Sequence, residues 1–468
     1  MYYNSLLTAG LLFLLSVSCN PSGQDAAPFG KAEEQYKTYC ASCHGEKMTA
    51  FTDRQWKHGN SDSALLASIR HGYPDAGMPG FDSVLTDSDK QNLVAYIQSG
   101  IANAGKYTFE DKPTTNLFQA DSMKFRLDTV FSGKGDIPWS IAFLPGGDLL
   151  VTERGGQLYR LSSNRTTTAI TGVPAVLAEG QGGLFDVAAD PAFASNKTIY
   201  LSYAKGVKTD SGVVATTAVS RAILDGTTLK EVNEIFEAKP YWLTKHHYGG
   251  RLAFTKEGYL LISVGDRGKE FVTPQSLLQG AGKIHRIKTD GSIPADNPFV
   301  QQPGAVASVY SYGHRNPQGM AVHPQTGAIW ENEHGPRGGD EINIADAGKN
   351  YGWPVITYGI NYDGTVIAKS AEKEGMEQPV LYWLPSIGPS GLAFLSGDRY
   401  KGWKNVALVG SLRFRYLNVC HLSNNRVVRE ETVLKNIGRV RDVRVSPDGW
   451  VYVAVESPGY VFKLVPVQ

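Results

Sequence analysis

The sequence predicts an all-β six-bladed β-propeller over residues 123–468, preceded by a small all-α domain over residues 28–105. In the larger region a turn followed by a strand of alternating character recurs six times, and no long amphipathic helix interrupts the series. The smaller region instead carries apolar residues at helical spacing. A pair of β-sandwiches is the weaker alternative for the larger region.

The six turn-and-strand units begin at Leu144, Asp190, Thr255, His323, Ser396 and Ser446. Their spacing of roughly fifty to seventy residues exceeds the length of a small four-stranded blade, so we expect blades with long inserted loops. The chain also contains 51 glycines, which suits a fold with many tight turns.

The composition limits the classes of function. The formal net charge is +1 over 468 residues, so no global electrostatic argument favours nucleic acid or an anionic membrane as a partner. The length predicts two domains and a leader. The four cysteines do not indicate a disulfide framework, and Cys420, alone in an apolar stretch, is expected to be a buried small hydrophobic side chain.

Residues 1–19 form the expected leader. The apolar run from Leu11 to Leu15 is too short to span a bilayer and indicates the core of a signal peptide. The small residues before Cys19 resemble the bacterial lipoprotein cleavage box, which implies lipidation of Cys19 and anchoring to a membrane. The alternative is an ordinary secretory signal. Either interpretation predicts a bacterial protein exported to the periplasm or cell envelope.

The run Cys40-Ala41-Ser42-Cys43-His44 is a haem-attachment motif, in which two thiols bond the haem and the adjacent imidazole binds its iron. The second iron ligand is expected to be Met78, in the Gly77-Met78-Pro79 loop. His58 and His71 are rival ligands without that loop context.

Two helices are expected to flank the Met78 loop. One spans Ser63 to Arg70, and the other begins at Thr86, has Leu93, Val94 and Ile97 at helical spacing and ends at Gly100. Together with the haem motif, this segment resembles a class I cytochrome c. Ligation of the iron by His44 and Met78 would raise its potential, as suits an electron acceptor. Residues 106–122, with Pro113, are expected to be a linker.

In a propeller, the loops between blades converge on one end of the central channel, so a site can be built from distant residues. Two arginine pairs, Arg413 with Arg415 and Arg439 with Arg441, are spaced two apart, so each pair would share a face if its segment were a strand. Each pair alone could be a solvated surface. With Arg315 they indicate instead a site for an oxygen-rich anionic ligand, because guanidinium groups match carboxylates.

The larger region resembles the soluble aldose (glucose-type) sugar dehydrogenases that use pyrroloquinoline quinone (PQQ) and calcium. The resemblance covers nearly all of residues 130–465 and rests on eight ordered segments: IPWSIAFLPGGDLLVTERGGQL, GQGGLFDVAADPAF, HHYGGRLAF, GKIHRIKTDGSIPADNPF, YGHRNPQG, EHGPRGGDEIN, NYGWP and RVRDVRVSPDG.

The resemblance implies a role for each matching residue. His247 would be the general base that removes the proton of the sugar C1 hydroxyl, and Arg315 and Asn316 would lie at the reactive carbonyl of the quinone. The implied PQQ contacts also include Gln181, Ser386, Arg413, Arg439 and Arg441.

The same resemblance implies calcium. The backbone carbonyls of Gly335 and Pro336 would bind the active-site ion. The residues Asp340, Glu341, Tyr351 and Asp363 fall where relatives hold a structural calcium. Asp340 and Glu341 could equally be surface ion-pair partners of Arg337.

The sequence departs from the family pattern near the cofactor. His246 replaces an Asp that some relatives place beside the base, which leaves the orientation of His247 open. Arg413 stands where the glucose enzyme has Lys. Leu384 takes the place of an aromatic residue that stacks on PQQ, and Trp383 is one residue away.

The function implied is oxidation of an aldose at C1 to its lactone, with electrons passing through the fused haem to another carrier or the respiratory chain. One alternative is a PQQ dehydrogenase for another sugar-like substrate, such as sorbosone. A second is a non-catalytic propeller that binds glycan or protein, with the cytochrome as a separate module.

Overall fold

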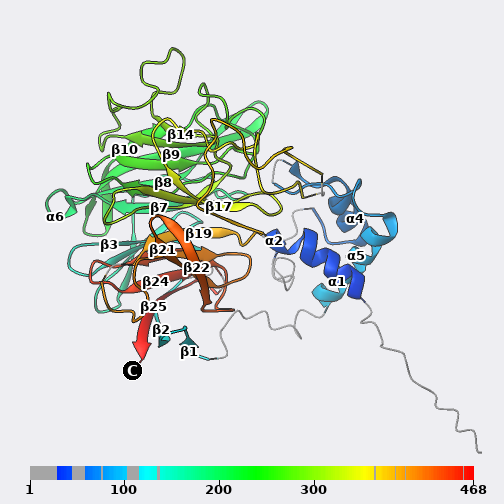
Figure 1. The fold of residues 1–468 in the computed structure, drawn as a ribbon, viewed down its shortest axis with the longest axis horizontal. Coiled ribbons are helices and arrows are strands. Elements are labelled where there is room, and N and C mark those ends of the chain that lie inside the picture. Colours follow the sequence, from blue (N-terminus) through cyan, green and yellow to red (C-terminus); the bar gives the residue numbers. More distant parts are fainter. Residues whose placement is uncertain are drawn as a thin grey trace, which may run out of the picture.

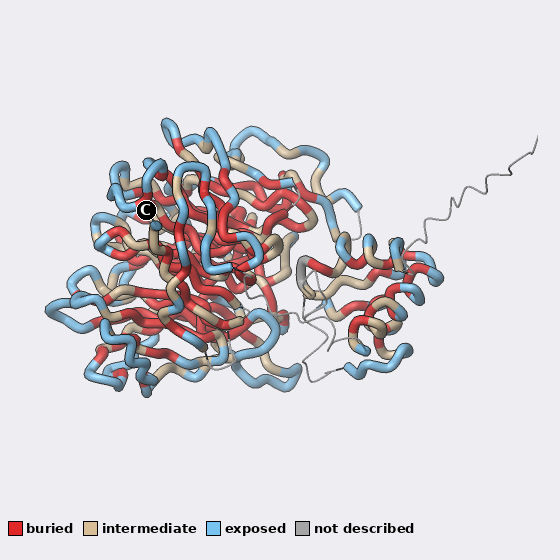
Figure 2. The backbone as a smooth tube through the Cα atoms, turned by 90° about the horizontal axis from the view of Figure 1, so that it is seen from below, coloured by how far each residue is buried: buried red, intermediate tan, exposed pale blue. Residues whose placement is uncertain are grey.

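The computed structural model describes residues 29–44, 58–74, 77–102, 115–133, 137–362, 365–384, 386–395, 397–456 and 458–467. A small helical domain lies beside a large β-sheet domain (Figure 1). Buried segments gather in the middle of each domain, and exposed loops surround them (Figure 2). No helix within these ranges is both long enough and apolar enough to cross a membrane.

The helical domain has one apolar core. Its helices are α1 (Gly30–Tyr39), α2 (Ala41–His44), α4 (Asp62–His71) and α5 (Asp87–Ala102). The buried core residues include Tyr36, Leu65, Ile69, Phe81 and Leu93. Both helices expected after the haem motif are present, α4 with one extra residue at each end and α5 with two residues beyond Gly100. Thr86 caps α5, because its Oγ1 accepts from the amide of Asp89 at 3.1 Å.

The described strands form six antiparallel sheets, which are the six blades of the expected propeller. Blade 1 contains β3 (Pro138–Phe143), β4 (Leu149–Glu153), β5 (Gln157–Leu161) and β6 (Thr167–Ile170). Blade 2 contains β7 (Leu184–Ala189), β8 (Thr198–Thr209), β9 (Gly212–Asp225) and β10 (Thr228–Glu237), with α6 (Phe193–Asn196) between its first two strands. Blade 3 contains β11 (Leu252–Phe254), β12 (Leu260–Val264), β13 (Lys283–Ile287) and β14 (Val309–Tyr312).

The remaining blades follow in chain order. Blade 4 contains β15 (Pro317–Val322), β16 (Ile329–Glu333), β17 (Asp340–Ala345) and β18 (Leu381–Trp383). Blade 5 contains β19 (Pro389–Phe394), β20 (Val406–Ser411), β21 (Leu417–Ser423) and β22 (Arg426–Val433). Blade 6 contains β23 (Val440–Val445), β24 (Val451–Val455), β25 (Tyr460–Val467), β2 (Lys124–Ser132) and β1 (Leu117–Gln119). The prediction of six blades is therefore confirmed.

The six repeated sequence units have one structural meaning. Each turn joins the first strand of a blade to the second, as between β3 and β4 or between β23 and β24. The second strands are buried over most of their length; β4, β12 and β24 each bury all five residues, and only the last five residues of β8 emerge toward solvent. Cys420 is fully buried on β21, as expected.

The ring closes through the two ends of the propeller chain. Strand β2 pairs with β25 from Lys124 opposite Val467 to Ser132 opposite Tyr460, so an N-terminal strand completes the last blade. Strand β1 then pairs with β2. It lies inside the range assigned to the linker, where it extends this sheet by one strand.

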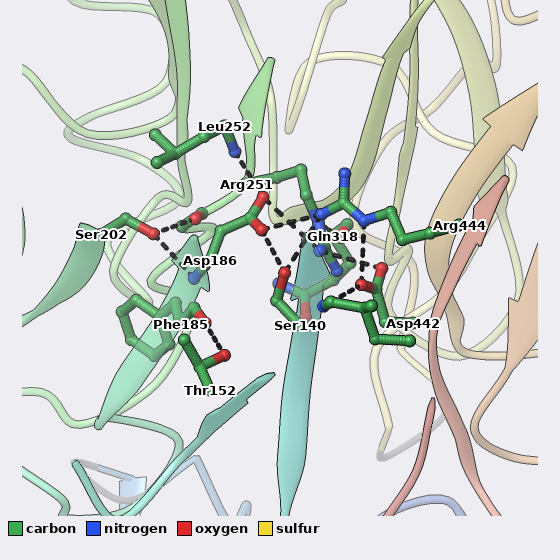
Figure 3. A network of polar contacts seen from close by, with 12 residues as sticks. Ser140, Thr152, Phe185, Asp186, Ser202, Arg251, Leu252, Gln318, Asp442 and Arg444 are labelled. Carbon is green, nitrogen blue, oxygen red and sulfur yellow. Dashed lines mark hydrogen bonds and ion pairs between the residues drawn. The ribbon is translucent and has the colours of Figure 1, made fainter. Parts of the chain in front are cut away.

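A buried ion network joins the innermost strands at the channel (Figure 3). Arg444 on β23 contacts Asp186 on β7 at 2.7 Å and Asp442 at 2.9 Å. Arg251, beside β11, contacts Asp442 at 3.0 Å and donates to the carbonyl of Gln318 on β15 at 2.9 Å. Burial alone would raise the pKa of Asp186, but Arg444 and Arg251 hold it below its ordinary value.

We expect Asp442→Asn to lower the free energy of unfolding by about 3–5 kcal/mol, because it leaves two arginines short of a buried partner. Arg126→Gln serves as the matched control, because it removes a surface pair with Asp128 and should cost no more than about 1 kcal/mol. Denaturant unfolding followed by tryptophan fluorescence measures both. Equal losses in the two variants would contradict this role for the network.

Candidate active site and haem-binding residues

His247 lies in the loop between β10 and β11, with a backbone φ of +53°. Its amide donates to Oε1 of Gln181 at 2.8 Å, and the amide of Gln181 in turn donates to the carbonyl of Lys245 at 2.8 Å. The side chain of His247 remains 14% exposed. The loop before β7 thus fixes the backbone of His247 while its imidazole stays accessible.

The imidazole of His247 is oriented by Asp266, in the loop after β12. The distance between Nδ1 of His247 and Oδ1 of Asp266 is 2.7 Å. Two further donors hold the same carboxylate: the indole Nε1 of Trp353 at 2.8 Å and the amide of Gly268 at 2.7 Å. Because an ionised carboxylate only accepts, Nδ1 carries the proton and Nε2 is the acceptor of the ring.

The protonation states agree with this arrangement. Burial alone would raise the pKa of Asp266, but His247 and its hydrogen bond lower it to about 2. Burial, followed by the charge of Arg315, lowers the pKa of His247 below its ordinary value. At neutral pH the pair is therefore an ionised carboxylate and a neutral imidazole.

Sequence reasoning missed Asp266 and Trp353. The orientation of His247 had been left open because His246 stands where an acidic neighbour was sought. The partner instead comes from the loop between β12 and β13, in the run Gly265-Asp266-Arg267-Gly268 directly after a fully buried strand. A polar residue at the end of a buried strand was the available signal.

Arg315 links this pair to the Gly335 loop. Its carbonyl accepts from the amide of Asp266 at 2.7 Å, and its Nη1 donates to the carbonyls of Gly335 at 2.8 Å and His334 at 3.1 Å. Its Nε is buried without a hydrogen-bond partner among the described residues. The guanidinium, 5.2 Å from the ring of Trp353, thus has a donor left for a ligand. Beside it, Oδ1 of the buried Asn316 accepts from the amide of Gly249 at 3.1 Å.

Asp340 clamps the Gly335 loop to the loop before β19. Its carboxylate accepts from the amide of Gly335 at 2.8 Å and from that of Gly388 at 2.7 Å. Burial raises the pKa of Asp340 to about 6. Asp340 is therefore a buried backbone clamp, and Arg337 lies instead over the ring of Tyr39.

The loop before β19 also reaches Pro336. Oγ of Ser386 is 3.4 Å from the carbonyl of Pro336, and Nη1 of Arg413 donates to the carbonyl of Ser386 at 3.1 Å. Gly335, Pro336, Ser386 and Arg413 therefore form one connected set.

The expectation that Arg413 and Arg415 share a strand face is wrong. Both lie in the loop between β20 and β21, and Arg415 has a φ of +57°. Arg439 precedes β23 and Arg441 lies on it, and both contact the buried carboxylate of Glu456, at 2.6 Å and 2.7 Å from their Nε atoms. Arg441 also donates to Gln318 at 2.9 Å. Glu456 thus offsets part of the positive charge expected here.

Trp383 and Leu384 were the two residues considered for stacking on a quinone, and neither places an aromatic ring beside the Gly335 loop. Trp383 is buried on β18 and donates from Nε1 to Glu430 at 2.7 Å. Leu384 is 59% exposed and packs against Gly338, where an added Cβ would lie 2.3 Å from its Cδ2. The aliphatic side chain of Leu384 therefore borders the Gly335 loop.

His314, Glu331 and Glu333 form a buried group in which the atoms able to bind a metal all lie within 4.8 Å of one another. Glu341 and Tyr351 border this group. Asn343 donates to Glu331 at 2.9 Å and to Glu341 at 3.3 Å, and the ring of Tyr351 stacks on His314 at 4.7 Å. Burial raises the pKa of Glu331 to about 7. Asp363 lies outside the described residues.

The residues predicted to bind haem lie in the helical domain. Cys40 caps the C-terminus of α1 and His44 ends α2, and the amide of His44 donates to the carbonyl of Cys40 at 2.9 Å. Cys43 lies on α2, and its side chain is outside the described part of the chain. Met78 pairs with Tyr73 through two backbone hydrogen bonds of 2.8 and 3.1 Å. Cys19 lies outside the described residues.

The two rival ligands lie on the surface. His58 and His71 are both exposed, and His58 stacks on Tyr73 at 3.8 Å. The Met78 loop instead packs tightly on the end of α4, where a Cβ on Gly72 would lie 2.4 Å from the carbonyl oxygen of Met78. Met78, the predicted second iron ligand, therefore lies where the chain is held against the end of α4.

Comparison with known proteins accounts for both domains. Residues 135–463 match the family model described as Glucose / Sorbosone dehydrogenase. The chain belongs to this family. Residues 27–97 match the model described as Cytochrome C oxidase, cbb3-type, subunit III, so a cytochrome c domain is fused to the glucose/sorbosone dehydrogenase propeller.

Individual relatives agree with that assignment. The aldose sugar dehydrogenase YliI of Escherichia coli (strain K12) is 43% identical over 343 residues, which cover 72% of this chain and 92% of that protein. The apo-form crystal structure of the soluble aldose sugar dehydrogenase from Escherichia coli is 41% identical, with a TM-score of 0.70 over 73% of this chain and all of that one. The PQQ-bound aldose sugar dehydrogenase from Streptomyces coelicolor is 27% identical, with a TM-score of 0.60 over 76% of this chain and all of that one. The protein is an oxidoreductase of the glucose/sorbosone dehydrogenase family.

We expect Asp266→Asn to lower kcat/KM for substrate oxidation by about 10²–10⁴-fold, because an amide no longer holds the imidazole with Nε2 as acceptor. Asp296→Asn, which alters an exposed partner of Arg286, should change the rate little. Steady-state oxidation with an artificial dye as acceptor measures both. An unchanged rate in Asp266→Asn would contradict the orienting role.

Proposed function

We propose that this enzyme oxidises an aldose at C1 to its lactone with PQQ and calcium, and passes the electrons to its own haem c. The observation that supports this most strongly is the neutral His247, oriented by Asp266 and joined through Arg315 to the carbonyl of Gly335. The names of the relatives support the same substrate class and cofactor.

His247 is the general base in this proposal. Its Nε2 takes the proton of the C1 hydroxyl, and the charge that develops on the ring is stabilised by Asp266 through Nδ1. The pKa of His247 is lowered, so the neutral base persists below its ordinary pKa of about 6.5. Activity should therefore be lost only as the pH falls through that lower value.

The donor set fits an anionic, oxygen-rich cofactor. PQQ, when bound, supplies a quinone that accepts two electrons from the sugar. Arg315 has an unused buried donor, and Arg439 and Arg441 share the carboxylate of Glu456. The residues that would hold the cofactor are Gln181, Arg315, Asn316, Ser386, Arg413, Arg439 and Arg441.

Calcium would be bound by the carbonyls of Gly335 and Pro336. A hard cation prefers oxygen ligands, and there it would act as a Lewis acid beside the quinone. Among the described residues, these carbonyls accept only from Arg315 and, at 3.4 Å, from Ser386, which leaves lone pairs for a cation. A second calcium would bind at Glu341 and Tyr351, with Asp363 as a further ligand, where it would offset the charge of Glu331 and Glu333.

The haem would be attached through Cys40 and Cys43 and bound by His44 and Met78. Ligation by these two residues suits an electron carrier, and a further cytochrome or the respiratory chain would receive its electrons. We also propose export to the periplasm or cell envelope, with Cys19 as the lipidated residue that tethers the enzyme to a membrane. The family name leaves a sorbosone-type substrate as the second candidate.

We expect sugar to reduce the haem once PQQ and Ca²⁺ are added to the apo-protein that carries covalent haem. The Soret and α bands of the haem report this directly. His247→Ala should abolish reduction by sugar, because no base remains, and should leave reduction by dithionite intact. Bands that stay oxidised with every aldose tested would end the sugar dehydrogenase proposal, while a response to sorbosone alone would favour the second candidate.

We expect Ca²⁺ to raise the melting temperature by a few degrees and a chelator to lower it, because an ion bound only to the folded state stabilises it. Glu341→Gln should reduce this shift, whereas the exposed Glu372→Gln should leave it unchanged. Differential scanning calorimetry measures the three proteins. A calcium shift that is identical in all three would contradict a second site at Glu341.

A further inference from the structure

Within the described parts of the two domains, two contacts join the helical domain to the propeller, and Figure 1 shows α2 on the side of the helical domain that faces it. In the first, Gly77 lies against His246: a Cβ added to Gly77 would be 3.2 Å from Cγ and 3.3 Å from Cβ of that histidine. In the second, the guanidinium of Arg337 lies 4.9 Å from the ring centroid of Tyr39.

Each contact is made by residues that are adjacent in sequence to predicted haem-binding residues on one side and to predicted active-site residues on the other. On the helical side, Tyr39 precedes the haem-attaching Cys40, and Gly77 precedes the iron ligand Met78. On the propeller side the partners are His246, which precedes the base His247, and Arg337, which follows Pro336. Both sides of the haem-binding region therefore rest on the loops that build the active site.

His246 contacts both the helical domain and the predicted base His247. Its ring lies 4.7 Å from the ring of His247, edge to face, and is enclosed between Gly77 and Gly268, where an added Cβ would lie 2.0 Å from Nε2 of His246. The residue is only 6% exposed, and its Nδ1 has no hydrogen-bond partner among the described residues. Burial, followed by the charge of His247, lowers the pKa of His246 to about 3, so the ring adds no charge at neutral pH.

The close approach of this loop to His246 requires glycine at position 77. Its φ is +80°, a conformation that glycine adopts readily, and any side chain there would collide with His246. Because the rate of electron tunnelling falls steeply with distance, direct backbone contact at this point allows faster transfer than a looser encounter between the domains.

We propose that the Gly77–Met78 loop on His246, with Tyr39 on Arg337, is a fixed docking interface through which electrons pass from the sugar-oxidising site to the haem. The inference rests on the proposed function. Each sugar oxidised yields two electrons and two protons. The haem iron takes one electron at a time, from Fe³⁺ to Fe²⁺, so a one-electron acceptor such as another cytochrome removes the first electron before the second arrives. The protons leave to solvent.

Disulfide trapping tests the docking itself. Gly77→Cys with His246→Cys places two Cβ atoms about 3.3 Å apart, just below the usual disulfide range of about 3.5–4.5 Å. We expect the disulfide in most molecules of the oxidised full-length holoprotein, detected by mass spectrometry of unreduced peptides. Gly77→Cys paired with Gly226→Cys, in the turn between β9 and β10, is the matched control and should form none. A double variant without the Gly77–His246 cross-link would overturn the proposal.

The locked protein then tests electron transfer. We expect sugar to reduce its haem at a rate within about twofold of that in the same variant reduced and alkylated beforehand, because no domain movement is needed. If locking stops haem reduction while dye-linked sugar oxidation continues, the docked state is not the transfer state and the proposal is wrong. If dye-linked oxidation is absent in the unaltered protein, the proposed function fails, while the cross-link still decides the docking.

Arg337→Gln provides a second measurement that leaves Gly77 and His246 intact. Loss of the contact with Tyr39 should slow haem reduction by sugar about two- to fivefold and leave dye-linked oxidation unchanged. Arg399→Gln removes a comparable contact, 3.8 Å from the ring centroid of Trp450, and should change neither rate. Equal effects of the two substitutions on haem reduction would contradict the interface.

Discussion

The buried ion network at the channel is the constraint on which the site depends. Asp186, Arg251, Asp442 and Arg444 tie the inner strands of three blades, and Arg251 adds the carbonyl of Gln318 from a fourth. Each strand so fixed has a residue of the candidate site on it or a few positions away, as Arg251 follows His247 and Asp442 follows Arg441. Since buried charges without partners are costly, the strands cannot shift independently. The positions of the adjoining loops are fixed as a result.

Much of the fold could be predicted from the sequence because its signals are local. A Gly- or Asp-containing turn before an alternating strand marks the first hairpin of every blade, and Thr86 with Asp89 marks the start of α5. The pairing of β2 with β25 was beyond that reasoning, because it joins residues more than 300 positions apart and no local pattern encodes the partner.

The site was predictable in its membership but not in its contacts. The loops that carry Gln181, His247, Arg315, Gly335 and Ser386 do meet, yet the partner of His247 is Asp266, which only the spatial relation of two loops in blade 3 reveals. The prediction for the arginine pairs was wrong for a different reason. The rule that alternate residues share a face holds only on a strand, and Arg413 and Arg415 lie on a loop, while the pairing of Arg439 and Arg441 with Glu456 depends on the register of β23 with β24.

The central claim is that a quinone and a calcium ion occupy the space bounded by His247, Arg315 and the Gly335 loop. A crystal structure of the protein reconstituted with PQQ and Ca²⁺ tests it most directly. The account predicts the quinone in contact with Arg315 and within reach of Nε2 of His247, with calcium bound by the carbonyls of Gly335 and Pro336. A cofactor bound elsewhere, or one turned away from His247, would contradict it.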